Sequence, residues 1–265
     1  MKILVVSTPR CRTTFLCQSI EQFYKIPNFH ESFDYISERY NIDYVRYGLM
    51  KKKPTLEEVK HQSKEYIQKT TSEILNNNGV AKLFPRYLLS YFFLEKNQYC
   101  SIDDLSNFSY LYHTDVSEMF NLSMYHKIIF LERDLIETAI SYAYGQQTKQ
   151  MLFTDKNLLN YVKRKDQKIE INYETFKMVN FLIFEFCIFN QLKKFIIKNY
   201  KNYENLTYDN CIDHVSNNYG AGENVKVIET NFDYSNLILN YDELRSYVVD
   251  TLQKYSMQVP NFYFK

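Results

Sequence analysis

The sequence contains few glycines and no tryptophan: only 5 of its 265 residues are Gly. Average usage would give a chain of this length roughly 19 glycines. The five present are Gly48, Gly79, Gly145, Gly220 and Gly222. Their spacing matches neither the G-x-G-x-x-G of a dinucleotide loop nor the G-x-x-x-x-G-K-[ST] of a Walker A loop. Any phosphate-binding loop in this chain must therefore work almost without glycine.

Long apolar runs and a disulfide pattern are also missing. The apolar start, residues 1–6, is too short for a signal peptide, and a polar loop follows it directly. The most apolar later stretch, residues 181–188, is interrupted by Glu185 and is too short to cross a bilayer. The five cysteines are odd in number and include no C-x-x-C pair, which favours a reducing compartment. We therefore expect a cytoplasmic protein without a membrane span.

Neither sign of charge dominates the chain. Lys and Arg number 32 against 31 Asp and Glu, so the formal net charge is +1. No field of the whole protein favours nucleic acid, so we expect no nucleic-acid partner and any basic site must be local. The five histidines are scattered without metal-ligand spacing, so no metal site is expected. The 45% of hydrophobic residues excludes a disordered tail, because such a chain can build a core.

Short apolar runs alternate with amphipathic stretches along the chain. Strands are expected at residues 3–7, 80–84, 127–131 and 205–208. Helices are expected at residues 13–24, 56–75, 134–144, 173–200 (one or two helices) and 241–255. This alternation predicts an α/β fold with a parallel sheet covered on both faces. Ligands of such sheets bind at the carboxyl ends of the strands.

The loop between the first strand and the first helix has the features of an anion site. A helix N-terminus offers free N–H groups and the positive end of the helix dipole. Thr13 and Thr14 add hydroxyl donors, and Arg10 and Arg12 add forked guanidinium donors. An ordinary turn with surface arginines would have the same sequence. Cys11 is a poor phosphatase-type nucleophile, because the required downstream arginine spacing is missing.

A second segment could hold a second phosphate. Arg133 follows the apolar strand at residues 127–131, and Ser141 lies about two turns into the next helix. Both can face the crevice at the carboxyl ends of the strands. By itself the pair could equally be a surface arginine and a small packing serine.

Together these segments resemble the superfamily of sulfotransferases that use PAPS, 3′-phosphoadenosine-5′-phosphosulfate. Residues 9–14 (Pro-Arg-x-x-Thr-Thr) are similar to its 5′-phosphosulfate loop, and the spacing of eight between Arg133 and Ser141 matches its 3′-phosphate motif. Residues 131–148 are most similar to the bacterial carbohydrate branch typified by trehalose 2-sulfotransferase. Weaker similarities lie at residues 30–33 (HESF), 79–83 (GVAKL) and 206–209 (LTYD, with Asp for the usual Glu). The resemblance covers residues 2–209.

The resemblance implies a P-loop-like three-layer α/β sandwich with a central parallel sheet of about four to five strands. It implies a single domain over residues 1–265, in which residues 210–265 remain an unassigned C-terminal part. PAPS would be the cofactor, with PAP as its product. The partner would be a carbohydrate or another small molecule with an acceptor hydroxyl.

The resemblance also implies roles for single residues. Glu31 would be the catalytic base, with the adjacent His30 as a rival, and Arg10 and Lys82 would stabilise the transferring group. The implied cofactor-binding residues are Arg10, Cys11, Arg12, Thr13, Thr14, Arg133, Ser141 and Tyr208. Of these, Arg133 and Ser141 would hold the 3′-phosphate, and Tyr208 would lie against the adenine.

One departure from the family pattern concerns the loop. The family usually has Ser-Gly where this chain has Cys11-Arg12. Glycine tolerates a positive φ and lets the backbone approach a phosphate closely. Either Arg12 takes a right-handed conformation and lends its charge, or the loop binds less tightly. Two other functions stay open: a kinase-like P-loop enzyme, and an inactive protein that binds PAP or PAPS.

Overall fold

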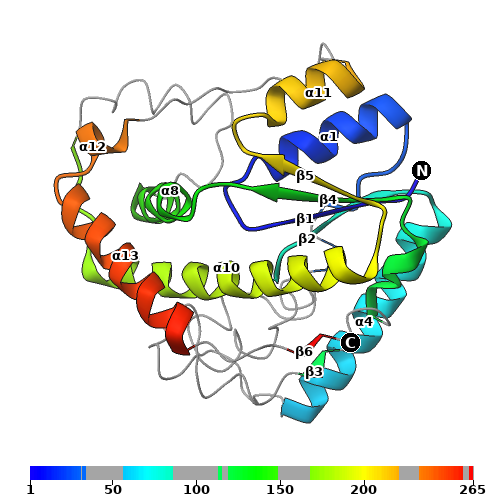
Figure 1. The fold of residues 1–265 in the computed structure, drawn as a ribbon, viewed down its shortest axis with the longest axis horizontal. Coiled ribbons are helices and arrows are strands. Elements are labelled where there is room, and N and C mark those ends of the chain that lie inside the picture. Colours follow the sequence, from blue (N-terminus) through cyan, green and yellow to red (C-terminus); the bar gives the residue numbers. More distant parts are fainter. Residues whose placement is uncertain are drawn as a thin grey trace.

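The computed structural model of the chain describes residues 1–30, 32–33, 56–85, 113–114, 119–148, 168–220, 233–258 and 263–264 (Figure 1). Its centre is a four-stranded sheet in the order β2-β1-β4-β5. The strands are β1 (Ile3–Ser7), β2 (Val80–Leu83), β4 (Lys127–Glu132) and β5 (Tyr203–Thr207). All three pairings between them are parallel. The expected α/β fold with a parallel sheet flanked by helices is therefore confirmed.

The alternation of side chains in β1 divides the core into two layers. Ile3 and Val5 pack with α1 (Thr13–Tyr24) and α11 (Cys211–Tyr219) on one face of the sheet. Leu4 and Val6 point to the other face, which is covered by α4 (Leu56–Asn76) and α10 (Tyr173–Asn199). A strand buried on both faces has to be apolar throughout, which explains the continuous run in this strand.

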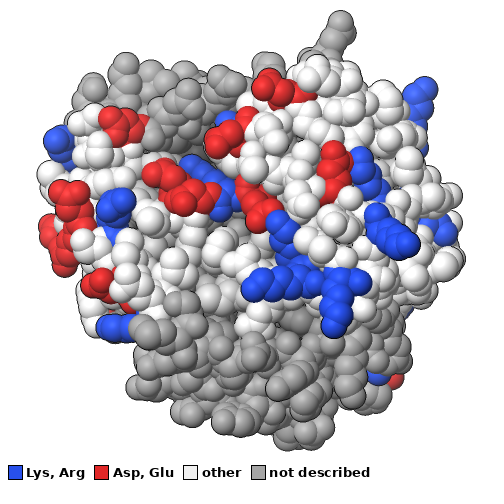
Figure 2. All heavy atoms as spheres, in the orientation of Figure 1, with Lys and Arg blue, Asp and Glu red and all other residues white. Residues whose placement is uncertain are grey.

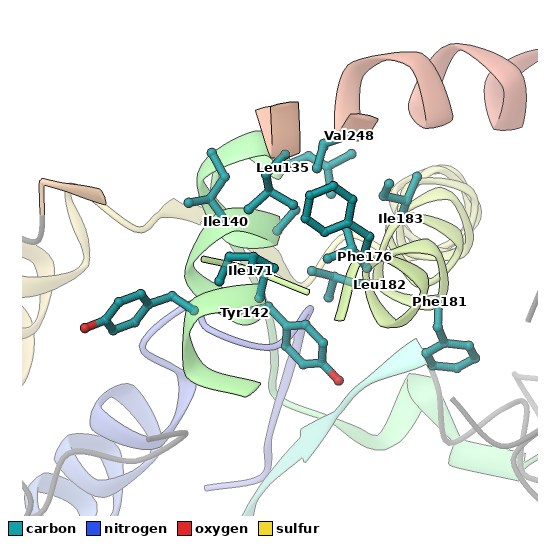
Figure 3. Packing of buried hydrophobic residues seen from close by; sticks show 14 of the residues in the cluster. Leu135, Ile140, Tyr142, Ile171, Phe176, Phe181, Leu182, Ile183 and Val248 are labelled. Carbon is teal, nitrogen blue, oxygen red and sulfur yellow. The ribbon is translucent and has the colours of Figure 1, made fainter. Parts of the chain in front are cut away.

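The long helix α10 contributes side chains to two hydrophobic clusters. Its second half packs on the sheet through Phe189, Leu192 and Ile196. Its first half packs with α8 (Leu135–Thr148) and α13 (Tyr241–Gln258) beside the carboxyl ends of the strands. Figure 3 shows Leu135 of α8, Phe176 of α10 and Val248 of α13 meeting in this second cluster. Because α10 is buried on different sides along its length, its sequence is apolar and aromatic with little polar face.

The remaining described elements are short. A helix, α12 (Tyr234–Leu237), precedes α13, and a 3-10 turn, η3 (Leu122–Met124), precedes β4. Two two-residue strands, β3 (His113–Thr114) and β6 (Tyr263–Phe264), pair in parallel apart from the main sheet.

The predicted elements agree closely with these bounds, and the expected helix at residues 173–200 is a single one. The side chain of Asp134 caps the start of α8 (Leu135–Thr148), since Glu137 N donates to Asp134 Oδ1 (3.0 Å). The helices α11 and α12 were not predicted. Both lie beyond residue 209, where the resemblance ends.

The N-terminus of α10 yields the first prediction. Asn172 is its N-cap, and its side chain accepts a hydrogen bond from Thr175 N (2.9 Å). Asn172→Ala should lower the free energy of unfolding by about 1 kcal/mol, because it leaves that N–H without its acceptor. Asn172→Asp keeps an acceptor at the same place and should stay close to wild type. Urea unfolding of the three proteins measures this, and equal losses in both variants would contradict the capping role.

Candidate anion site at the carboxyl edge of the sheet

The predicted site residues follow the carboxyl ends of four neighbouring strands. Because the strands are parallel and in register, these ends lie at one edge of the sheet. Lys82 belongs to β2, the loop with Arg10 and Arg12 follows β1, Arg133 follows β4, and Tyr208 follows β5. Sequence positions more than 190 residues apart along the chain are thus neighbours, as the bond between Arg12 and Tyr208 shows (|i−j| = 196).

The loop after β1 has an alternating backbone. Arg10 (φ 67°) and Arg12 (φ 62°) are left-handed, whereas Pro9, Cys11 and Thr13 beside them are not among the residues with positive φ. Such an alternation turns successive N–H groups toward one concave side, the arrangement called a nest, which binds anions in P-loops. Of the two alternatives that the sequence left open, the right-handed conformation of Arg12 does not apply: this arginine takes the conformation that glycine usually supplies.

The left-handed conformation of Arg12 is offset by contacts of its side chain. A non-glycine residue in this region costs about 1–2 kcal/mol. Arg12 Nη1 donates to the backbone oxygen of Tyr208 (2.8 Å), and its Cζ lies 3.8 Å from the centroid of the Tyr208 ring. A hydrogen bond from a charged donor contributes about 1.5–3 kcal/mol, and a cation–π contact about 0.5–2 kcal/mol. These contacts are large enough to hold the loop in its strained form.

Small polar groups of the loop and of the end of β1 also hold the loop in place. The hydroxyls of Ser7 and Thr13 are 3.0 Å apart, and both residues are buried. Thr8 Oγ1 lies 3.4 Å from Cys11 Sγ, which in turn donates to the oxygen of Pro9 (3.6 Å). These contacts are made by hydroxyl, thiol and carbonyl groups, so none of them uses an N–H group of the loop backbone.

The first turn of α1 adds further donors. Arg12 is its N-cap and provides no side-chain hydrogen bond to the turn, which has no acidic residue either. The first helical bond after the cap runs from Leu16 N to Arg12 O (3.1 Å), so the preceding N–H groups lack helical acceptors. Lys82 is 3% exposed, and its Nζ donates to Thr14 Oγ1 (3.2 Å) beside them. A helix N-terminus with a buried ammonium group next to it favours a negatively charged ligand.

Arg133 is connected to the same loop and to the same tyrosine. Its Nη1 donates to Arg10 O (3.3 Å), and its Cζ lies 4.2 Å from the centroid of the Tyr208 ring. The ring therefore contacts two guanidinium groups, those of Arg12 and Arg133, and its π-electrons reduce the cost of bringing them together. The role against adenine expected for Tyr208 stays a prediction.

Ser141 meets Arg10 across the edge of the sheet. Arg10 Nε donates to Ser141 Oγ (3.2 Å), and the hydroxyl of Tyr234 donates to the same oxygen (2.9 Å). Tyr234 comes from α12, and the sequence gives no signal for it, because it is one of 25 tyrosines in a segment without a recognisable motif.

Glu31, the predicted base, lies outside the described residues, and only its neighbours can be placed. The backbone oxygen of His30 accepts a hydrogen bond from Lys82 N (3.2 Å), so residue 30 lies beside β2. His30 has a left-handed backbone (φ 46°), and its side chain is exposed. The choice between Glu31 and His30 as the base stays open.

Glu185 is a second residue that the sequence analysis did not assign to the site. It belongs to α10 and is fully buried, with 0% of its surface exposed. Burial raises the pKa of the Cys11 thiol to about 11, while the charge of Arg133 acts to lower this pKa and that of Glu185 to raise it. Glu185 is therefore within electrostatic reach of the loop. The signal in the sequence was its place as the one charge in an apolar stretch.

The thiols near the loop are poor nucleophiles. Burial also raises the pKa of Cys17 to about 12 and that of Cys211 to about 11. At neutral pH a thiol with such a pKa is almost entirely protonated, and the thiolate is the reactive form. The geometry thus agrees with the sequence-based argument against a phosphatase-type cysteine.

In the described part of the chain, no cluster of three or more His, Cys, Asp or Glu side chains is arranged to hold a metal ion. None of the helices described there combines the length and apolarity needed to cross a membrane.

Comparison with known proteins identifies no family. No protein-family model matches the chain, and no curated protein matches it significantly. The resemblance to sulfotransferases therefore continues to depend on the motifs in the sequence.

The raised thiol pKa values yield the second prediction. Cys11, Cys17 and Cys211 should resist iodoacetamide at pH 8 in the folded protein and react fully in urea, as measured by peptide mass spectrometry. The unfolded chain should lose these protons near the ordinary pKa of 9.0, earlier than the folded chain does. The free energy of unfolding should therefore fall as the pH rises from about 9 to 11. Rapid modification of Cys11 in the native state would contradict its burial.

Proposed function

We propose that this protein is a PAPS-dependent sulfotransferase acting on a hydroxyl of a carbohydrate or small metabolite. The observation that carries the proposal is the alternating backbone at Arg10 and Arg12, which forms a nest at the N-terminus of α1. It occurs in the loop that resembles the 5′-phosphosulfate loop. Arg133 and Ser141, the pair that resembles the 3′-phosphate motif, both contact Arg10. A ligand with two separate anionic groups suits this arrangement.

The charge of the site is local, as the proposal requires. Arg10, Arg12, Lys82 and Arg133 converge on one edge of the sheet, although the whole chain has a formal charge of only +1. Figure 2 shows acidic and basic side chains interspersed over the described part of one face. The convergence of cations is thus a property of this edge, and it would favour the binding of phosphate and sulfate groups.

The proposed reaction needs positioning more than covalent chemistry. A bond forms between the acceptor oxygen and the sulfur while the bond from sulfur to the bridging phosphate oxygen breaks, and PAP leaves. Glu31 would take the hydroxyl proton. Arg10 and Lys82 would stabilise the charge that develops on the leaving phosphate, since both are held near the loop.

Removal of the Arg133 side chain tests whether the site binds the 3′-phosphate of PAP. Arg133→Ala should weaken the binding of PAP about 10- to 100-fold, because a phosphate loses a charged, forked donor worth about 1.5–3 kcal/mol. Arg245→Ala is the matched control, since it removes the same charge from an exposed position on α13. Isothermal titration calorimetry measures both affinities. Unchanged PAP binding by Arg133→Ala would exclude the assignment of the 3′-phosphate.

Thermal shift measurements separate the competing classes of enzyme. PAP should raise the melting temperature of the wild-type protein more than ATP with magnesium or NAD does. A larger shift with ATP and magnesium would favour a kinase-like enzyme. Tight binding of PAP without turnover on a broad panel of acceptors would favour an inactive binding protein.

A substitution at Glu31 tests whether this residue is the catalytic base. Glu31→Gln should abolish sulfuryl transfer, because the amide cannot accept the hydroxyl proton, and should leave the affinity for PAP within about twofold. His30→Gln is the companion variant that tests the rival base. Transfer assays with PAPS and a panel of sugars measure both. Full activity of Glu31→Gln together with loss in His30→Gln would assign the base to the histidine.

A further inference from the structure

The hydroxyl of Ser141 differs from the two threonine hydroxyls of α8. Thr138 donates to the backbone oxygen of Asp134 (2.7 Å), and Thr148 donates to that of Tyr144 (2.7 Å). This bond to the carbonyl four residues earlier is the usual partner of a Ser or Thr hydroxyl in a helix. Ser141 instead faces the edge of the sheet, where it accepts two hydrogen bonds.

The two bonds use the acceptor capacity of the hydroxyl completely. A hydroxyl oxygen has two lone pairs and one hydrogen. Arg10 Nε fills one lone pair (3.2 Å) and the hydroxyl of Tyr234 fills the other (2.9 Å). Neither contact takes the hydrogen of Ser141, and the described residues provide no acceptor for it. Ser141 is 1% exposed, and a buried donor without an acceptor costs free energy.

From this geometry we infer that Tyr234 is a positioning residue that, together with Arg10, makes Ser141 a donor only and aims its hydrogen at an oxyanion. A phosphate or sulfate oxygen is an acceptor without a hydrogen when fully ionised, so it complements such a group. A neutral hydroxyl ligand could accept this hydrogen bond but could not donate its own hydrogen to Ser141, whose lone pairs are both used. The guanidinium group of Arg10 beside Ser141 favours an acceptor that carries negative charge. The inference deepens the proposed function and rests on it for the identity of the ligand, while the donor role of Ser141 stands on the hydrogen bonds alone.

The packing of Tyr234 allows its hydroxyl to be tested separately from its ring. The ring is 7% exposed and packs against Tyr144, with centroids 5.5 Å apart. Tyr234→Phe keeps the aromatic ring and removes the hydroxyl that donates to Ser141. Tyr125→Phe is a matched control, because the buried hydroxyl of Tyr125 has no hydrogen-bond partner in the described part of the structure and precedes β4 at the opposite end of the sheet.

The decisive experiment is a double-mutant cycle of Tyr234→Phe and Ser141→Ala. Calorimetry measures the affinity of each variant for PAP and for inorganic pyrophosphate, which has no adenine. Tyr234→Phe and Ser141→Ala should each weaken binding about three- to tenfold, the worth of one neutral hydrogen bond. The double variant should bind no more weakly than Ser141→Ala, because Tyr234 acts through Ser141. Tyr125→Phe should bind as the wild type does, and melting temperatures check that each variant is folded.

The outcomes separate the two proposals. Pyrophosphate binding with the expected cycle but no binding of PAP would support the role of Tyr234 and overturn the proposed function. PAP binding that Tyr234→Phe leaves unchanged, or losses that simply add, would overturn the role of Tyr234 and leave the sulfotransferase proposal intact. If the wild type binds neither anion, both proposals are wrong.

Discussion

The strained backbone at Arg10 and Arg12 is the constraint on which the rest of the candidate site depends. Two left-handed residues, separated by Cys11, turn the chain from the end of β1 into α1 and direct N–H groups to one side. In an arginine this conformation has to be stabilised by contacts with residues outside the loop. The partners are found at the ends of β4 and β5, so the loop can hold its shape only when the sheet is assembled.

The same contacts reduce the repulsion between the cationic side chains of the site. Four cationic side chains at one edge of a sheet repel one another, and two of them, Arg12 and Arg133, contact one ring. Tyr208 follows β5, the strand next to β4, and its π-electrons attract both guanidinium groups. The fully buried side chain of Glu185 lies within electrostatic reach of the loop. An anionic ligand would add to this compensation.

Much of the fold and part of the candidate site could be predicted from the sequence, because local sequence patterns determine them. The apolar run at residues 3–7 and the amphipathic stretch after it predicted a strand, a loop and a helix with the observed bounds. The spacing between Arg133 and Ser141 predicted that both would face one crevice, and both contact Arg10. The φ of Arg12 could not be predicted, since the side-chain partner that stabilises it, Tyr208, is 196 positions away. Tyr234 could not be predicted either, because only the folded chain brings α12 to α8.

The part of the chain beyond residue 209 matters more than its lack of motifs suggested. It provides α11, which packs with α1 over the sheet, and α13, which packs with α8 and α10 beside the strand ends. The helix that carries Ser141 is therefore fixed by a hydrophobic cluster to which the C-terminal residues contribute, Val248 among them (Figure 3). A hydroxyl can direct its hydrogen at a ligand only if its helix is held in place. The geometry of the anion site thus depends on packing contributed by the very residues that sequence motifs left unassigned.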